Sequence, residues 1–158
     1  MTAPAVVHPE ARDVEARWFE WAGTVDHKRI GILYLVTALF YFVVAGCEAL
    51  VVRLQLAEPR GRLLTPEAYN ELFTMHGVTM IFLVVMPALT GFANYFVPLM
   101  IGARDVAFPR LNLLSWYVFM FGGIFAVGSI LVGGVDTGWT FYTPYSSTYS
   151  NGWVIAMA

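Results

Sequence analysis

Charged and apolar positions are separated along the chain into long blocks. No charged residue occurs in residues 30–47, 72–103 or 111–135, which are runs of 18, 32 and 25 positions. A helix that crosses a bilayer needs about 20 predominantly apolar residues. The pattern therefore predicts an all-α membrane protein with three transmembrane helices.

These helices are expected at residues 30–52, 72–100 and 111–131, followed by an outer loop at 132–150. A further apolar run begins at residue 151 and ends after eight residues. That run is too short to cross a bilayer, so residues 151–158 are interpreted as the start of a truncated fourth helix.

Composition agrees with this interpretation, because 58% of the residues are hydrophobic, only 13% are charged and the mean hydropathy is +0.64. An average soluble domain has roughly a quarter charged residues. The high apolar content makes the lipid bilayer an expected partner. The basic residues form no cluster typical of nucleic-acid binding, so nucleic acid is not an expected partner.

Basic residues predict the orientation of the chain. Residues 1–29 are polar and lack the pattern of a secretory signal, and the segment up to Asp26 suggests a short amphipathic surface helix. Lys28 and Arg29 end this segment. Arg104 and Arg110 flank the link between the second and third helices, whereas the last loop has no lysine or arginine. The positive-inside rule therefore predicts a cytoplasmic amino terminus. Arginines of the first loop lie on the predicted outer side and need another explanation: Arg53, Arg60 and Arg62.

His76 is an ionisable side chain near the outer end of the second predicted helix. Intramembrane ionisable residues are costly and often functional. Two interpretations stay open: a hydrogen-bonded packing residue, or a ligand to a metal or haem iron, which imidazole nitrogen commonly binds. The chain offers no second histidine ligand, because His8 and His27 lie on the predicted inner side.

Other polar residues have a structural and a functional interpretation. Asp105, in the inner link, could collect protons or simply suit a turn. Arg53 could bind an anion or a carbonyl acceptor near His76, or extend to the membrane–water interface. Glu48 could pair with an arginine or be protonated. Trp139 and Tyr142 are typical of an interfacial aromatic belt.

Five stretches taken together resemble subunit I of the haem-copper terminal oxidases, within the cytochrome c oxidase branch. The resemblance covers about 120 of the 158 residues, in order and with similar spacing. The stretches are "DHKRIGILYL" (26–35), "RLQLA" (53–57), "ELFTMHGVTMIFLVVMP" (71–87), "GFANYFVPLMIGARDVAFPRLN" (91–112) and "GWTFYTPYS" (138–146). The resemblance implies that the chain is the first part of a twelve-helix bundle.

The resemblance also implies roles for residues near a haem. His76 matches one of two axial ligands of the low-spin haem, which would be haem a. Arg53 matches the arginine that hydrogen-bonds the formyl group of that haem, which would explain its outer position. Trp139 and Tyr142 match aromatic residues near the haem propionates.

A second set of residues matches the entrance of a proton channel on the inner face. Asp105 matches the carboxylate at its mouth, Asn94 and Asn112 match two asparagines that line it, and Tyr34 matches a tyrosine in the same region. Leu113 departs from the family, in which a second asparagine often follows the first.

By this resemblance, the complete complex transfers electrons from cytochrome c to dioxygen, forms water and couples the reaction to proton uptake and pumping. Quinol oxidases carry a histidine and a glutamine at the positions of Ala68 and Glu71, so cytochrome c is the favoured donor and quinol the alternative. A non-enzymatic three-span membrane subunit, with His76 packing between helices, is the other alternative.

The family's remaining metal ligands, for the low-spin haem, the high-spin haem and copper, lie in later helices. The chain alone is therefore expected to be inactive and to need other oxidase subunits, including the copper-bearing subunit II. The 26 residues before His27 favour a bacterial plasma membrane over a mitochondrial one.

Overall fold

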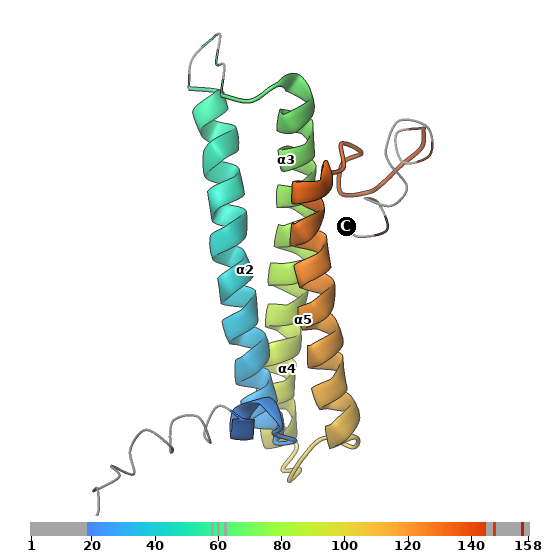
Figure 1. The fold of residues 1–158 in the computed structure, drawn as a ribbon. Coiled ribbons are helices and arrows are strands. Elements are labelled where there is room, and N and C mark those ends of the chain that lie inside the picture. The colour runs from blue at the N-terminus through green and yellow to red at the C-terminus, as the bar shows by residue number, and fades with distance from the viewer. Residues whose placement is uncertain are drawn as a thin grey trace, which may run out of the picture.

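The computed structural model describes residues 19–57, 59, 61, 63–144, 147 and 156. Within them the chain forms helices and no strand, and three helical rods run side by side (Figure 1). The helices are α2 (His27–Gln55), α3 (Pro66–Val78), the π-helix η1 (Thr79–Val85), α4 (Met86–Met100) and α5 (Pro109–Val132). The predicted all-α class is confirmed.

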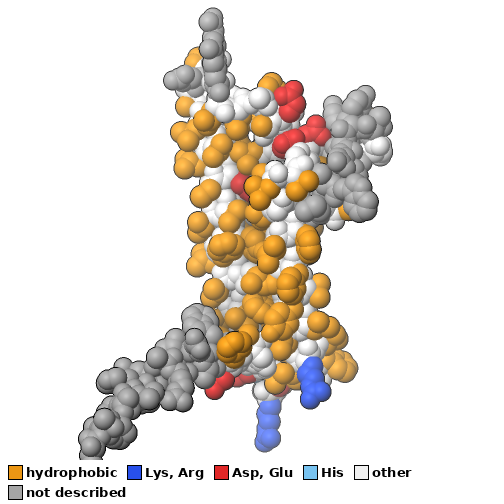
Figure 2. Space-filling model, in the orientation of Figure 1, with side chains coloured by type: hydrophobic (Ala, Val, Ile, Leu, Met, Phe, Trp, Pro, Cys, Tyr) orange, Lys and Arg blue, Asp and Glu red, His pale blue; other side chains and the backbone are white. Residues whose placement is uncertain are grey.

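All three rods are long and apolar enough to cross a membrane: His27–Gln55, Pro66–Met100 and Pro109–Val132. The second rod consists of α3, η1 and α4 in succession. Hydrophobic side chains cover much of the surface in Figure 2, and the lysine and arginine side chains seen there lie at one end. The chain is therefore a multi-pass membrane protein.

Capping residues explain why the helices are longer than the apolar runs. Asp26 caps α2 by accepting a hydrogen bond from the Lys28 backbone N–H at 2.8 Å. Thr65 caps α3 by accepting one from the Ala68 N–H at 3.2 Å, and Pro66 occupies the first turn. These caps lie in polar flanking sequence, so the helices begin before the hydrophobic segments do.

The π-helix η1 lies directly before a proline. Pro87 follows Met86, the first residue of α4, and has no backbone N–H to donate. A proline ring also clashes with the carbonyl of the residue four positions earlier, here Leu83, which lies within η1. The wider π-helical turns accommodate this local conflict while the rod continues.

The rods pack in an up-down-up arrangement, so the start of α2, the end of α4 and the start of α5 share one end of the molecule (Figure 1). Gly31 and Gly91 bring α2 and α4 into close contact, since a Cβ added to Gly91 would lie 2.9 Å from the Gly31 carbonyl oxygen. Two buried clusters join α2 to the other rods: Ile30 and Tyr34 with Trp116, and Tyr41 with Leu83 and Ala126.

Two expectations concern residues at the ends of the chain. Residues 19–22 form a helical turn before α2, and residues 23–26 are not helical, so the expected amino-terminal surface helix does not extend to Asp26. Residues 1–18 lie outside the described residues. The expected fourth helix at 151–158 also lies outside them, except for residue 156. Of the first loop's arginines, Arg53 alone belongs to the described part of the chain.

Candidate functional site

His76 lies in the last turn of α3, where it is half-buried against α2. Its Nδ1 lies 3.0 Å from the backbone carbonyl oxygen of Ala45, so Nδ1–H donates a hydrogen bond across the two helices. This bond fixes the tautomer and leaves Nε2 with its lone pair. Histidines that bind metals usually donate their other ring N–H in this way, to a carbonyl or carboxylate. The Nε2 of His76 is therefore chemically suited to bind a metal ion, including the iron of a haem.

The loop after α5 is held against the helix that carries His76. The Gly138 backbone N–H donates to the Thr74 hydroxyl at 3.0 Å. A Cβ added to Gly77 would lie 3.3 Å from the Cβ of Trp139, so the absence of a side chain there lets the loop approach α3. Trp139 thus packs against Gly77, the residue that follows His76 in the chain, although 48% of Trp139 is exposed.

Tyr142 lines a cavity of about 270 Å³ between α3 and this loop, together with Phe73 and Asp136. Arg53 lies in the last turn of α2 and is exposed. It is eight residues beyond Ala45 and therefore roughly 12 Å further along the helix axis. The four residues expected near a haem thus share the half of the molecule that holds the end of α2 and the start of α3.

At the opposite end, Asp105 joins the link between α4 and α5 to the start of α2. Its Oδ1 accepts a hydrogen bond from the Val106 backbone N–H at 2.8 Å and lies 3.2 Å from Nδ1 of His27. His27 is 97% buried within the described chain, since only 3% of it is exposed, and its Nε2 has no hydrogen-bond partner there. The carboxylate therefore contacts a group that can exchange a proton.

Asn94 and Asn112 line one open cavity of about 420 Å³, to which Val106 also contributes. The two asparagines come from α4 and α5, so the structure brings together residues far apart in the sequence. The side-chain nitrogen of Asn112 is buried and has no hydrogen-bond partner within the described residues. Asp105 itself does not line the cavity but is the neighbour of Val106 in the chain.

Tyr34 lies outside this cavity, in the buried contact between α2 and α5. Its hydroxyl donates to Ser115 Oγ at 2.8 Å, and the Ser115 hydroxyl donates to the backbone carbonyl of Asn112 at 2.6 Å. Tyr34 is 4% exposed and stacks against Phe119. It is therefore connected to the asparagine cavity through Ser115 rather than by direct contact.

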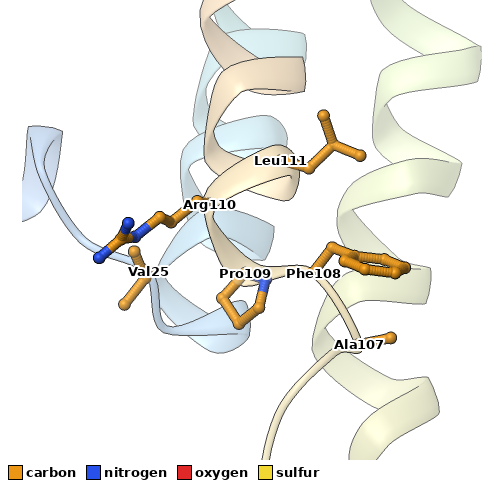
Figure 3. Close-up of a pocket in the computed structure, with 6 residues that line it drawn as sticks. All are labelled: Val25, Ala107, Phe108, Pro109, Arg110 and Leu111. Atoms are coloured by element: carbon orange, nitrogen blue, oxygen red, sulfur yellow. The ribbon is translucent and has the colours of Figure 1, made fainter.

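Another cavity at this end of the molecule has a different character. It has a volume of about 470 Å³ and is lined by Val25, Arg110 and the apolar residues around Pro109. Figure 3 shows the Arg110 guanidinium directed toward Val25, whereas Phe108 and Leu111 extend on the other side of the start of α5. The described residues that line this cavity include no pair of groups that could perform acid–base chemistry. Nor does the described part of the chain contain a cluster of three metal-ligating side chains.

Comparison with known proteins identifies the family. Residues 29–158 match the family model "Cytochrome C and Quinol oxidase polypeptide I". The chain belongs to this oxidase family. It is 51% identical over 138 residues to cytochrome c oxidase subunit 1 of Bacillus subtilis, which covers 87% of this chain and 22% of that protein.

Other members of the oxidase family are similar. A putative cytochrome c oxidase subunit 1-beta of Streptomyces avermitilis is 44% identical over 149 residues, or 92% of this chain and 26% of that protein. A heme-copper oxidase subunit I+III of Aeropyrum pernix is 45% identical over 131 residues, or 82% of this chain and 16% of that protein. The oxidase chain thus spans about a quarter or less of these relatives and corresponds to the amino-terminal part of subunit I.

Two features of the site were not predicted from the sequence. The Ala45 carbonyl that orients His76 is a backbone group, so no side-chain pattern marks it. The sequence excludes His27 as a second haem ligand but does not predict its contact with Asp105, which spans 78 positions of sequence. Glu48 forms no ion pair with an arginine among the described residues.

Proposed function

We propose that the chain is the amino-terminal part of the catalytic subunit of a respiratory terminal oxidase, in which it supplies one axial ligand of the low-spin haem and the entrance of a proton path. The complete complex would transfer electrons from cytochrome c to dioxygen, produce water, and couple this reaction to proton uptake and pumping. Family membership supports the reaction class, and the placement of polar groups at opposite ends of the rods supports the division of roles.

The orientation of His76 is the observation that carries the haem assignment. Its Nδ1–H is engaged by the Ala45 carbonyl at 3.0 Å, and this arrangement directs the free lone pair of Nε2 away from α2. Arg53, Trp139 and Tyr142 lie toward the same outer end and would contact the edge of the haem. When bound, the haem would carry electrons singly between donor and dioxygen site. A high-spin haem and copper would bind to later parts of the subunit.

The inner end of the rods has the groups that proton uptake requires. Asp105 is half-buried and contacts His27, so its carboxylate can hydrogen-bond both to water and to an imidazole. Asn94 and Asn112 line the adjacent cavity with amide groups that can hydrogen-bond to water. Tyr34 and Ser115 continue this polar path toward the middle of the helices.

The proposed electron donor is cytochrome c. Quinol oxidases use a histidine and a glutamine on the helix before the haem ligand, and this chain has Ala68 and Glu71 there. Alanine offers no hydrogen bond to a quinol, and the Glu71 side chain packs close to Gly134. We further propose that the subunit lies in a bacterial plasma membrane with its amino terminus in the cytoplasm, and assembles with other oxidase subunits including the copper-bearing subunit II.

The substitution His76→Ala in the complete oxidase tests this proposal. We expect the absorbance of the low-spin haem to disappear, because the iron loses one of its ligands. The matched control is His27→Ala, which removes a buried histidine at the other end and should leave the low-spin spectrum intact. A His76→Ala enzyme that keeps its low-spin haem would show that His76 is only a packing residue.

A further inference from the structure

Glu48 is a buried carboxyl group in the outer half of α2, and the proposed function does not use it. It is 5% exposed, and neither of its carboxyl oxygens has a hydrogen-bond partner within the described residues. No lysine or arginine forms an ion pair with it in that part of the chain. An unpaired carboxylate inside a membrane protein carries a large desolvation cost, so the neutral acid is the favoured form. A neutral acid has one O–H to donate.

Thr79, the first residue of η1, lies beside this carboxyl group and is 0% exposed. Threonines within helices commonly donate to the carbonyl four residues earlier. Thr37, Thr74 and Thr90 do so here, at 2.7 to 3.0 Å. The Thr79 hydroxyl has no hydrogen-bond partner among the described residues, so its oxygen is free to accept the Glu48 proton.

The pair lies next to the contact that orients His76. Ala45 and Glu48 are three residues apart in α2 and therefore share a helix face, as do His76 and Thr79 in the second rod. The Ala45 carbonyl accepts the His76 hydrogen bond at 3.0 Å. A bond between Glu48 and Thr79 would thus connect the same two faces, just where the second rod changes from α-helix to the wider π-helix.

We propose that Glu48, as a neutral carboxylic acid, donates a hydrogen bond to the Thr79 hydroxyl and so positions His76. The bond holds the start of η1 against α2 and fixes the axial and rotational register of the turn that carries the imidazole. Glu48 is a positioning residue, because it acts on the haem ligand through Thr79. The part of this inference that concerns the haem rests on the proposed function.

Infrared difference spectra of the complete oxidase test the bond itself. We expect Glu48→Gln to remove a carbonyl-stretch band of a protonated carboxylic acid. Thr79→Val, which replaces the hydroxyl by a methyl group, should shift that band to higher frequency because the acid loses its acceptor. The matched control Thr90→Val should leave the band in place. A spectrum without a Glu48-dependent acid band, or a band that Thr79→Val does not move, overturns the proposal.

The low-spin haem spectrum tests the positioning role. We expect shifted absorbance and reduction potential in Glu48→Leu and Thr79→Val, and a nearly wild-type spectrum in Glu48→Gln, whose amide can still donate to Thr79. If His76→Ala abolishes the low-spin haem but both disruptive variants leave its spectrum unshifted, the positioning claim alone fails. If low-spin haem persists in His76→Ala, the proposed function fails, and the infrared measurement decides the Glu48–Thr79 bond.

Discussion

The contact between α2 and α4 depends on two glycines, and Gly91→Ala is the sharpest test of it. A Cβ at position 91 would lie 2.9 Å from the Gly31 carbonyl oxygen, 2.9 Å from Leu35 Cγ and 3.1 Å from Tyr34 Cβ. Favourable contacts between such atoms are found at about 3.5–4.0 Å. The helices must therefore separate by roughly 0.5–1 Å, which forfeits a quarter to a half of each dispersion contact along their crossing.

Overpacking of this kind typically costs about 1–3 kcal/mol, and we expect that loss in the free energy of unfolding. The assay is unfolding of the protein in mixed micelles by increasing mole fraction of SDS, followed by tryptophan fluorescence. Gly46→Ala is the control. It adds a Cβ to α2, the other helix of this contact, at a position where nothing lies within 4 Å of that atom. It should change the stability by less than about 0.5 kcal/mol.

A double variant extends the test. A Cβ at Gly31 would lie 2.8 Å from the Gly91 carbonyl oxygen, so the same separation of the helices relieves both clashes. The loss for Gly31→Ala with Gly91→Ala should therefore be smaller than the sum of the two single losses. Equal stability of Gly91→Ala and Gly46→Ala would refute the reasoning, because it would mean that the helices do not approach each other as closely as described.

Three further predictions concern polar groups. Gln55→Ala removes three hydrogen bonds between the Gln55 side chain and the backbone of residues 61 and 64, at 2.9 to 3.4 Å. Protease cleavage of this loop should therefore accelerate about tenfold for each 1.4 kcal/mol lost, and an unchanged rate would contradict this role. Tyr34→Phe should cost about 0.5–1.5 kcal/mol of unfolding free energy, because the hydrogen bond to Ser115 is lost. The control Tyr41→Phe loses no described hydrogen bond and should cost less, and equal losses would contradict a stabilising role of the Tyr34–Ser115 bond. Asp105→Asn should slow oxygen consumption by the complete oxidase by about 10²-fold with unchanged haem content, because an amide cannot carry the proton; normal turnover would exclude Asp105 from the proton path.

The three rods were predictable because a membrane imposes long apolar runs, and such runs are visible in a single sequence. Their ends were less predictable. Thr65 and Pro66 start α3 within a polar stretch, so the helix includes residues that hydropathy assigns to the loop. The π-helix at Thr79–Val85 could not be read from its own apolar residues, because its cause is the proline that follows.

The candidate site was also predictable from the sequence only in part. His76 stands out in the sequence because it is ionisable and lies within an apolar run, whereas Asp105 stands out only through the family resemblance. The groups that orient them do not: the His76 partner is a backbone carbonyl, and the His27 contact with Asp105 depends on how α2 meets the link after α4. Contacts between residues so far apart depend on the packing of whole helices, which local sequence does not encode.

The central claim is that His76 binds the iron of a low-spin haem, and chemical rescue tests it most directly. His76→Ala leaves room for a free imidazole, which can supply the missing nitrogen ligand. Magnetic circular dichroism of the complete oxidase should lose its low-spin haem signal in this variant and regain it on addition of imidazole. A low-spin signal that persists in His76→Ala without imidazole would contradict the account.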